Sequence, residues 1–317
     1  MRTVSLAARI VLALVLTYVM LQIARNTSRG HPEFTSHSEN GFTFEMTTVP
    51  KGPENGKARV ELKISGPITE TVHPVVHFSS TSENSVVHLV LSDSTTGTYF
   101  TEMNCGARGS KRQYLIEVRD DNDKILASFG QPNGTPFETK SIGEVPKPVL
   151  IGHIFFMFAT VFCVAMGAIS AFPVLFGKGK FRMAMTFFAC AAAFTLVGGY
   201  PYGFAMNWYA FGGIWEGVPF GTDATDNKTQ LLLFYLLLVA LGALGTVTKG
   251  KFGRDIFGQK TLAALGVLAL FLLLGIYLIP HSIQFSAATT YGVCYSFIGV
   301  CVLAYLVGFF RSAKRTL

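Results

Sequence analysis

The apolar residues of this chain follow two patterns: long uninterrupted runs and short stretches that alternate with polar residues. Most of the long runs approach the ~20 residues that a helix needs to cross ~30 Å of hydrocarbon. We therefore expect about six transmembrane helices, over residues 10–24, 150–176, 183–204, 231–247, 262–279 and 289–310. A small-x-small cleavage site is poorly matched after the first run, so residues 1–25 are interpreted as an uncleaved N-terminal transmembrane anchor.

Short alternating stretches occupy the region between the first two runs. Period-two alternation predicts half-buried strands over residues 42–46, 60–64, 75–78, 86–91, 98–100, 114–118 and 125–129. Residues 120–123, Asp-Asp-Asn-Asp, predict a hairpin turn between the last two strands. Seven short strands without a helical stretch favour an extramembrane, all-β, immunoglobulin-like sandwich over residues 26–148. The cysteine–tryptophan–cysteine core of antibody domains is absent, because this region has one cysteine, Cys105, and no tryptophan.

Basic residues are concentrated in the segments on one side of the expected helices. With the N-terminus inside, twelve of the 26 basic and one of the 19 acidic residues lie inside, a net charge of +11, and the rest of the chain carries −4. This positive-inside bias predicts that both termini are cytoplasmic and that the sandwich is outside. The location that we favour is a bacterial inner membrane with a periplasmic β-domain. The excess charge therefore indicates contact with anionic lipids and no role in nucleic-acid binding.

Two histidines stand at the outer ends of expected helices in residues 149–317, the predicted five-helix bundle. His153 begins the second span and His281 follows the fifth. Polar side chains at membrane depth usually face a bundle interior, and two neutral imidazoles on facing helices can ligate one b-type haem iron. The alternatives are that each histidine hydrogen-bonds at the interface or contacts a lipid or partner subunit, or that the pair belongs to a quinone or metal site.

The outer segment 198–230 is rich in glycine and aromatic residues and is predicted to be a loop in the head-group layer. A simple aromatic belt explains this composition, and a lid over a haem or quinone that includes Trp215 is the alternative. The end of the segment is polar. Thr225 or Asp226 is expected to cap the next helix, whereas Asp223 and Asp226 together suit a hard cation and Lys228 suits a haem propionate.

The sandwich has its own histidine group. His73 and His77 lie on one face if they share a strand, and His88 falls on a neighbouring strand, so the three could hold copper or zinc. Exposed histidines on strands without a metal are the simpler interpretation, since Pro74 interrupts the strand and no methionine- or cysteine-rich set accompanies them.

No catalytic signature was found among nucleophile elbows, zinc-protease motifs, phosphate-binding loops or dinucleotide fingerprints. The chain is therefore expected to be a non-catalytic or electron-transfer subunit. The leading hypothesis is a membrane subunit of a respiratory-type complex that binds one b-type haem, with other membrane subunits and a periplasmic redox or structural protein as partners. The alternatives are a cofactor-free scaffold whose immunoglobulin-like domain docks periplasmic partners and an outer-side copper- or zinc-handling protein.

Overall fold

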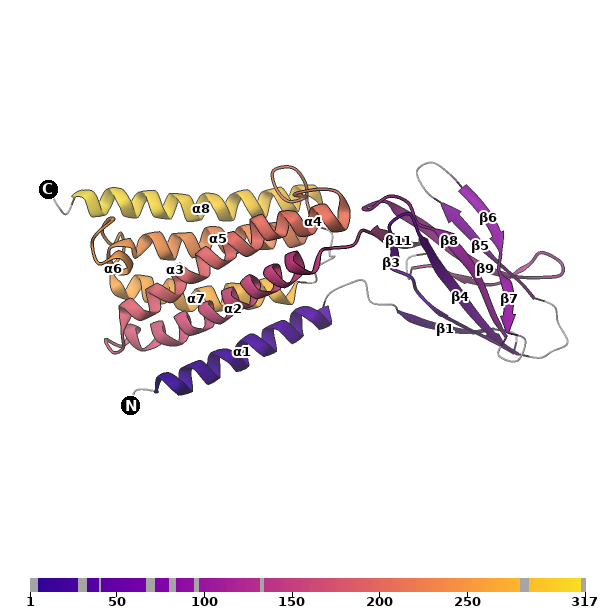
Figure 1. Ribbon diagram of the computed structural model, residues 1–317, viewed down its shortest axis with the longest axis horizontal. Coiled ribbons are helices and arrows are strands. Elements are labelled where there is room, and N and C mark those ends of the chain that lie inside the picture. Colours follow the sequence, from indigo (N-terminus) through magenta and orange to yellow (C-terminus); the bar gives the residue numbers. More distant parts are fainter. Residues whose placement is uncertain are drawn as a thin grey trace. The chain divides into compact units, whose positions relative to one another are not determined.

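The computed structural model describes residues 5–27, 33–39, 41–66, 72–79, 84–93, 97–131, 134–279 and 285–314. The chain divides into two compact units. One, the helical unit, comprises residues 1–29, 146–206 and 214–317, and the other, the β unit, comprises residues 30–145 and 207–213. Figure 1 labels most of the elements of both.

The β unit contains two sheets. The strand order is β1-β2-β4-β8-β7 in the first and β3-β11-β9-β5-β6 in the second, where β10 also pairs with β9. All pairings are antiparallel except that of β11 with β3. The strands are β1 (Phe34–Glu39), β2 (Phe42–Thr47), β3 (Lys51–Pro53), β4 (Lys57–Ser65), β5 (Val72–Ser79), β6 (Asn84–His88), β7 (Val90–Asp93), β8 (Thr98–Asn104), β9 (Lys111–Asp120), β10 (Ile125–Phe129) and β11 (Phe137–Ile142).

Alternation in the sequence becomes alternation of burial in this unit. In β4 every second residue is buried, and residues from both sheets enter one apolar cluster, among them Phe44, Leu62 and Ile116. Large side chains from two facing sheets therefore fill a common core. The hairpin expected at residues 120–123 is confirmed, since β9 and β10 pair on either side of it.

Two details of the strand prediction were wrong. The stretch 86–91 is divided at Leu89, which is 6% exposed and whose N–H donates to Pro74 O, because the chain leaves the edge of one sheet there and joins the edge of the other. Three further strands, β1, β3 and β11, were not predicted. β3 has three residues, too few for a period to show.

A short segment from outside the β region completes the β unit. Residues 207–213 pack on it through Gly143 N–H, which donates to Ala210 O. Two cations also cover rings of this segment: Lys140 Nζ lies 3.8 Å from the Phe211 ring centroid, and Arg108 Cζ lies 5.1 Å from that of Trp208. These two aromatic residues therefore have partners within the β unit, which an interfacial belt does not require.

Among the described residues, five helical stretches are long and apolar enough to cross a membrane, over residues 6–23, 147–175, 181–211, 259–278 and 287–313. They belong to the helical unit, except that the third ends in residues 207–211, which are part of the β unit. The sixth expected span is not among them, because the helix that carries it begins with polar residues. The helices are α1 (Leu6–Thr27), α2 (Lys147–Leu175), α3 (Phe181–Val197), the π-helix η1 (Gly198–Tyr202), α4 (Gly203–Phe211), α5 (Ala224–Gly242), α6 (Leu244–Thr248), α7 (Gln259–Leu278) and α8 (Ala287–Lys314).

Glycines let aromatic rings enter the helix contacts of this unit. Phe188 of α3 is fully buried between Gly167 of α2 and Gly266 of α7. A Cβ atom at Gly167 would lie 2.8 Å from Phe188 Cζ, and one at Gly266 would lie 2.4 Å from Phe188 Cε2. In the same way Phe257 meets Gly242 of α5 and Gly308 of α8. Small residues therefore permit close approach, as in other membrane helix pairs.

Candidate functional site

His153 lies near the start of α2, where Pro148 occupies the first turn and needs no hydrogen-bond acceptor. Its Nδ1 is 2.9 Å from Gly198 O. A carbonyl oxygen only accepts, so Nδ1 carries the hydrogen and Nε2 keeps its lone pair. The side chain is half-buried. His281, the second expected haem ligand, lies outside the described residues.

The acceptor of this hydrogen bond belongs to an irregular piece of helix. Residues expected to open a loop continue α3 as the π-helix η1, followed by α4, so that the irregular segment begins only after Phe211. Pro201 has no N–H, which removes one ordinary helical hydrogen bond and accounts for the local widening. The outer segment is therefore helical over 198–211, which corrects the expectation of a loop there.

Two adjacent glycines bring η1 close to its neighbours. A Cβ at Gly198 would lie 2.6 Å from Phe156 Cβ on α2, and one at Gly199 would lie 2.3 Å from Thr229 Cγ2 on α5. Any larger residue would push these helices apart. The Gly-Gly pair thus fixes the distance at which the Gly198 carbonyl meets His153.

Beyond η1, three aromatic rings form a cluster. Tyr200 and Trp215 stack with centroids 5.3 Å apart and an interplanar angle of 13°, and Phe204 meets both edge-on at 5.6 and 5.7 Å. Trp215 Nε1 donates to Val218 O. These rings line an open cavity of about 570 Å³, whose other lining residues are Ile214, Val218, Pro219, Phe220 and Gln230.

The polar residues at the start of α5 hold the segment that forms this cavity. Asp223 is the N-cap of α5, in place of the expected Thr225 or Asp226, and its Oδ1 accepts from the N–H groups of both. Asp226 Oδ2 accepts from Glu216 N–H at 2.7 Å, and Asn227 Oδ1 accepts from Val218 N–H at 2.8 Å. The two carboxylates that suit a hard cation therefore bind backbone N–H groups.

Lys228 has a structural partner as well. The side chain is buried, and its Nζ donates to Ile279 O at 2.6 Å, at the C-terminal end of α7. A cation is favourable at that end of a helix dipole. This contact is a use for Lys228 that the sequence did not suggest, and the role expected for it at a haem propionate stays a prediction.

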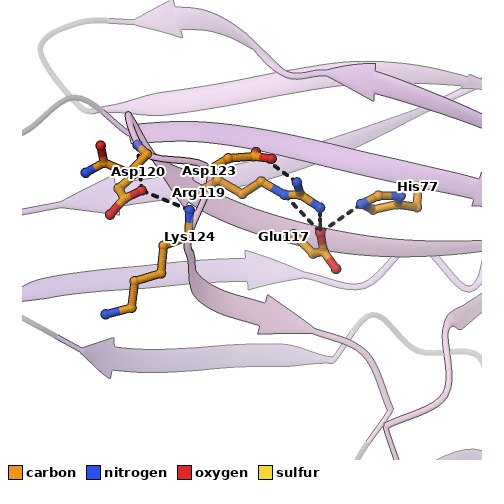
Figure 2. A network of polar contacts seen from close by, with 7 residues as sticks. His77, Glu117, Arg119, Asp120, Asp123 and Lys124 are labelled. Carbon is orange, nitrogen blue, oxygen red and sulfur yellow. Dashed lines mark hydrogen bonds and ion pairs between the residues drawn. The ribbon is translucent and has the colours of Figure 1, made fainter.

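His77 of the β unit belongs to a network of hydrogen bonds and ion pairs (Figure 2). His77 Nε2 lies 2.9 Å from Glu117 Oε2, and Arg119 donates to the same oxygen at 2.7 Å and to Asp123 at 2.9 Å. The hydrogen bond from Arg119 and then the contact with His77 lower the pKa of Glu117. The network stabilises the start of the β9–β10 hairpin.

The expected strand arrangement of these histidines is correct. His73 and His77 share β5, and His88 on β6 pairs with Val75, so the three occupy one face. His73 and His77 are nevertheless paired separately, with Asp121 and Glu117. Among the described residues no group of three histidine, cysteine or acidic side chains is arranged to hold a metal ion. The geometry therefore adds no support for copper or zinc.

No protein-family model matches this sequence, and no curated protein is similar to it. The sequence singled out His153 and Trp215, and it marked Asn227 as a possible cation ligand, whereas in the structure Asn227 accepts from Val218 N–H. Gln230 and the π-helix were missed. The Gly-Gly-Tyr-Pro sequence at 198–201 is the signal that could have indicated a close helix contact.

Proposed function

We propose that this protein is an integral membrane subunit of an electron-transfer complex and that it holds one b-type haem near the outer membrane face. His153 and His281 are the proposed axial ligands. The proposal also includes six membrane crossings, with α5 as the additional one. It further includes an immunoglobulin-like periplasmic domain and a location in a bacterial inner membrane. Other membrane subunits and a periplasmic redox protein are its expected partners.

The hydrogen bond between His153 and Gly198 O is the observation that supports this proposal. Histidines that ligate metals usually donate their other ring N–H to a carbonyl or carboxylate, which fixes the tautomer and the ring orientation. In His153 the bond from Nδ1 has this form, and Nε2 is left as the donor atom for iron. When bound, haem would supply the one-electron chemistry, while this residue would hold and orient it.

A reduced-minus-oxidised visible spectrum and a pyridine haemochrome assay on the purified chain test the proposal. We expect a b-type signal near one haem per chain that is lost in both His153→Ala and His281→Ala. His73→Ala, which removes a half-exposed histidine of the β unit, is the matched control and should keep the signal. A flat spectrum from fully assembled complex would refute haem binding.

A cofactor-free scaffold is the second candidate, and the edge strands of the β unit favour it. Within the described residues β6 and β7 each pair on one side only and carry exposed Val86, Val90 and Leu91. Unpaired, apolar edges attract a further strand from a partner. If this role is correct, Val86→Lys with Val90→Lys abolishes co-purification of partner proteins, whereas Ile125→Lys on β10 does not. Retained co-purification would contradict it.

A further inference from the structure

The cavity beside Trp215 has the features of a site for a small ring compound. Its volume of about 570 Å³ lies within the ~300–1,000 Å³ typical of small-molecule sites. Four of its lining residues are aromatic, Tyr200, Phe204, Trp215 and Phe220, and none of the lining residues is charged. A flat, neutral ligand therefore matches the cavity, because rings stack on such walls and a charged group would find no counter-ion there.

Gln230 provides the polar group of this site. Its side chain is half-buried and lines the cavity, and its Oε1 is buried with no hydrogen-bond partner among the described residues. A buried carbonyl oxygen without a partner costs about 1–3 kcal/mol, and a rotation of the Gln230 side chain toward the cavity would give this oxygen a ligand donor. Trp215 also lines the cavity, but its ring N–H already donates to Val218 O.

An amide is suited to one particular class of ring. It carries a donor and an acceptor, and a half-turn of its terminal bond exchanges their positions. The same side chain can therefore donate to the carbonyl of a quinone or accept from the hydroxyl of a quinol. An acyl chain of a lipid could fill the apolar space but would leave Gln230 Oε1 unpaired.

We propose that the cavity lined by Tyr200, Phe204, Trp215 and Gln230 binds the head group of a quinone or quinol, with the ring against the aromatic walls and one ring oxygen on the Gln230 amide. This inference names a substrate class for the electron-transfer function proposed above. It assigns binding only and needs no haem for its test.

The two tryptophans of the chain make the test specific. Trp208→Phe leaves Trp215 as the single tryptophan, and Trp208 does not line the cavity. The chain in lipid nanodiscs is titrated with a short-chain benzoquinone, a short-chain naphthoquinone and, as a ring-free competitor, a long-chain alcohol. We expect saturable quenching of Trp215 emission by a quinone and no displacement by the alcohol.

Gln230→Leu should weaken quinone binding about tenfold, the effect of one hydrogen bond of ~1.4 kcal/mol. Gln259→Leu, at an exposed position that begins α7, is the matched control and should bind as the parent does. If Gln230→Leu fails to fold, Phe204→Leu, which removes one aromatic wall, should weaken binding by several-fold. Quenching that rises linearly without saturation, unchanged affinity in the folded variants, or displacement by the alcohol would overturn the proposal.

The spectrum and the titration of the chain that keeps both His153 and His281 together separate the two proposals. Saturable quinone binding by this chain with no b-type signal would support the cavity and refute the haem. A b-type signal with no saturable quenching would refute the cavity alone.

Discussion

The β unit and the helical unit use opposite kinds of residue for close packing. In the sandwich large side chains such as Phe44 and Leu62 fill the space between two sheets. In the helical unit Phe188 fits where Gly167 and Gly266 leave room for it. The difference follows from the solvent, because burial of large apolar groups stabilises a fold in water, whereas helices in lipid gain chiefly from close contact. It also predicts where each unit is most sensitive.

Gly266→Leu should produce the largest loss of stability. The new side chain would begin 2.4 Å from Phe188 Cε2, inside a fully packed contact, at a cost of about 3 kcal/mol. Gly275→Leu is the matched control on the same helix, since a Cβ there meets nothing within 4 Å. Thermal unfolding in detergent measures both. Equal melting temperatures for the two variants would show that the glycine contact is unimportant.

Gly52→Ala should cause the next largest loss of stability, and it tests whether the β unit has a glycine contact of its own. A Cβ at Gly52 would lie 2.3 Å from Cys105 Sγ, so we expect a loss of about 1–2 kcal/mol. Cys105→Ala removes that sulfur, although it also leaves a cavity. The double variant should therefore lose less stability than the sum of the losses of the two single variants. Urea unfolding of the full chain measures the three losses, and additive losses would contradict this contact.

Glu117→Gln should have the smallest effect, about 0.5 kcal/mol, because its network lies at the surface. The pKa of Glu117 is lowered in the fold, so its stabilisation is present above the unfolded pKa of ~4.3 and is lost as pH falls through the lower, folded value. Wild type and variant should therefore differ at pH 7, and the difference should shrink as pH falls below the unfolded pKa of ~4.3. Hydrogen exchange of β5 and β9 amides measures the stability of wild type and variant at each pH. A stability difference that does not change with pH would contradict this role of Glu117.

The sequence predicted the parts of this molecule that repeat. Alternation indicated all seven expected strand regions, and long apolar runs indicated the helices α1, α2, α3, α7 and α8. It did not predict β3, which has three residues and pairs with the distant β11. Nor did it predict the division at Leu89, because alternation does not show that the chain passes there from one sheet to the other.

The candidate site was harder to predict from the sequence, because its contacts join residues that are far apart along the chain. His153 was identified by its place at a helix end, but its acceptor Gly198 is 45 residues away. The polar residues at the start of α5 looked like ligands because carboxylates and amides bind ions and backbone N–H groups alike. Only the fold shows that Asp226 and Asn227 accept from residues 216 and 218.

This arrangement gives a way to find relatives of the chain. A Cβ atom at Gly217 would clash with Asp226 and Asn227, and a Cβ atom at Gly221 would lie 2.3 Å from Glu216 O. The pattern Gly-x3-Gly-x4-Asp-Asn is thus a geometric requirement of the segment, and Asp223, which lies between its members, is the N-cap of α5. Sequences that keep this spacing ahead of an apolar helix, even where overall similarity has vanished, are the ones in which the same wall of rings should be sought.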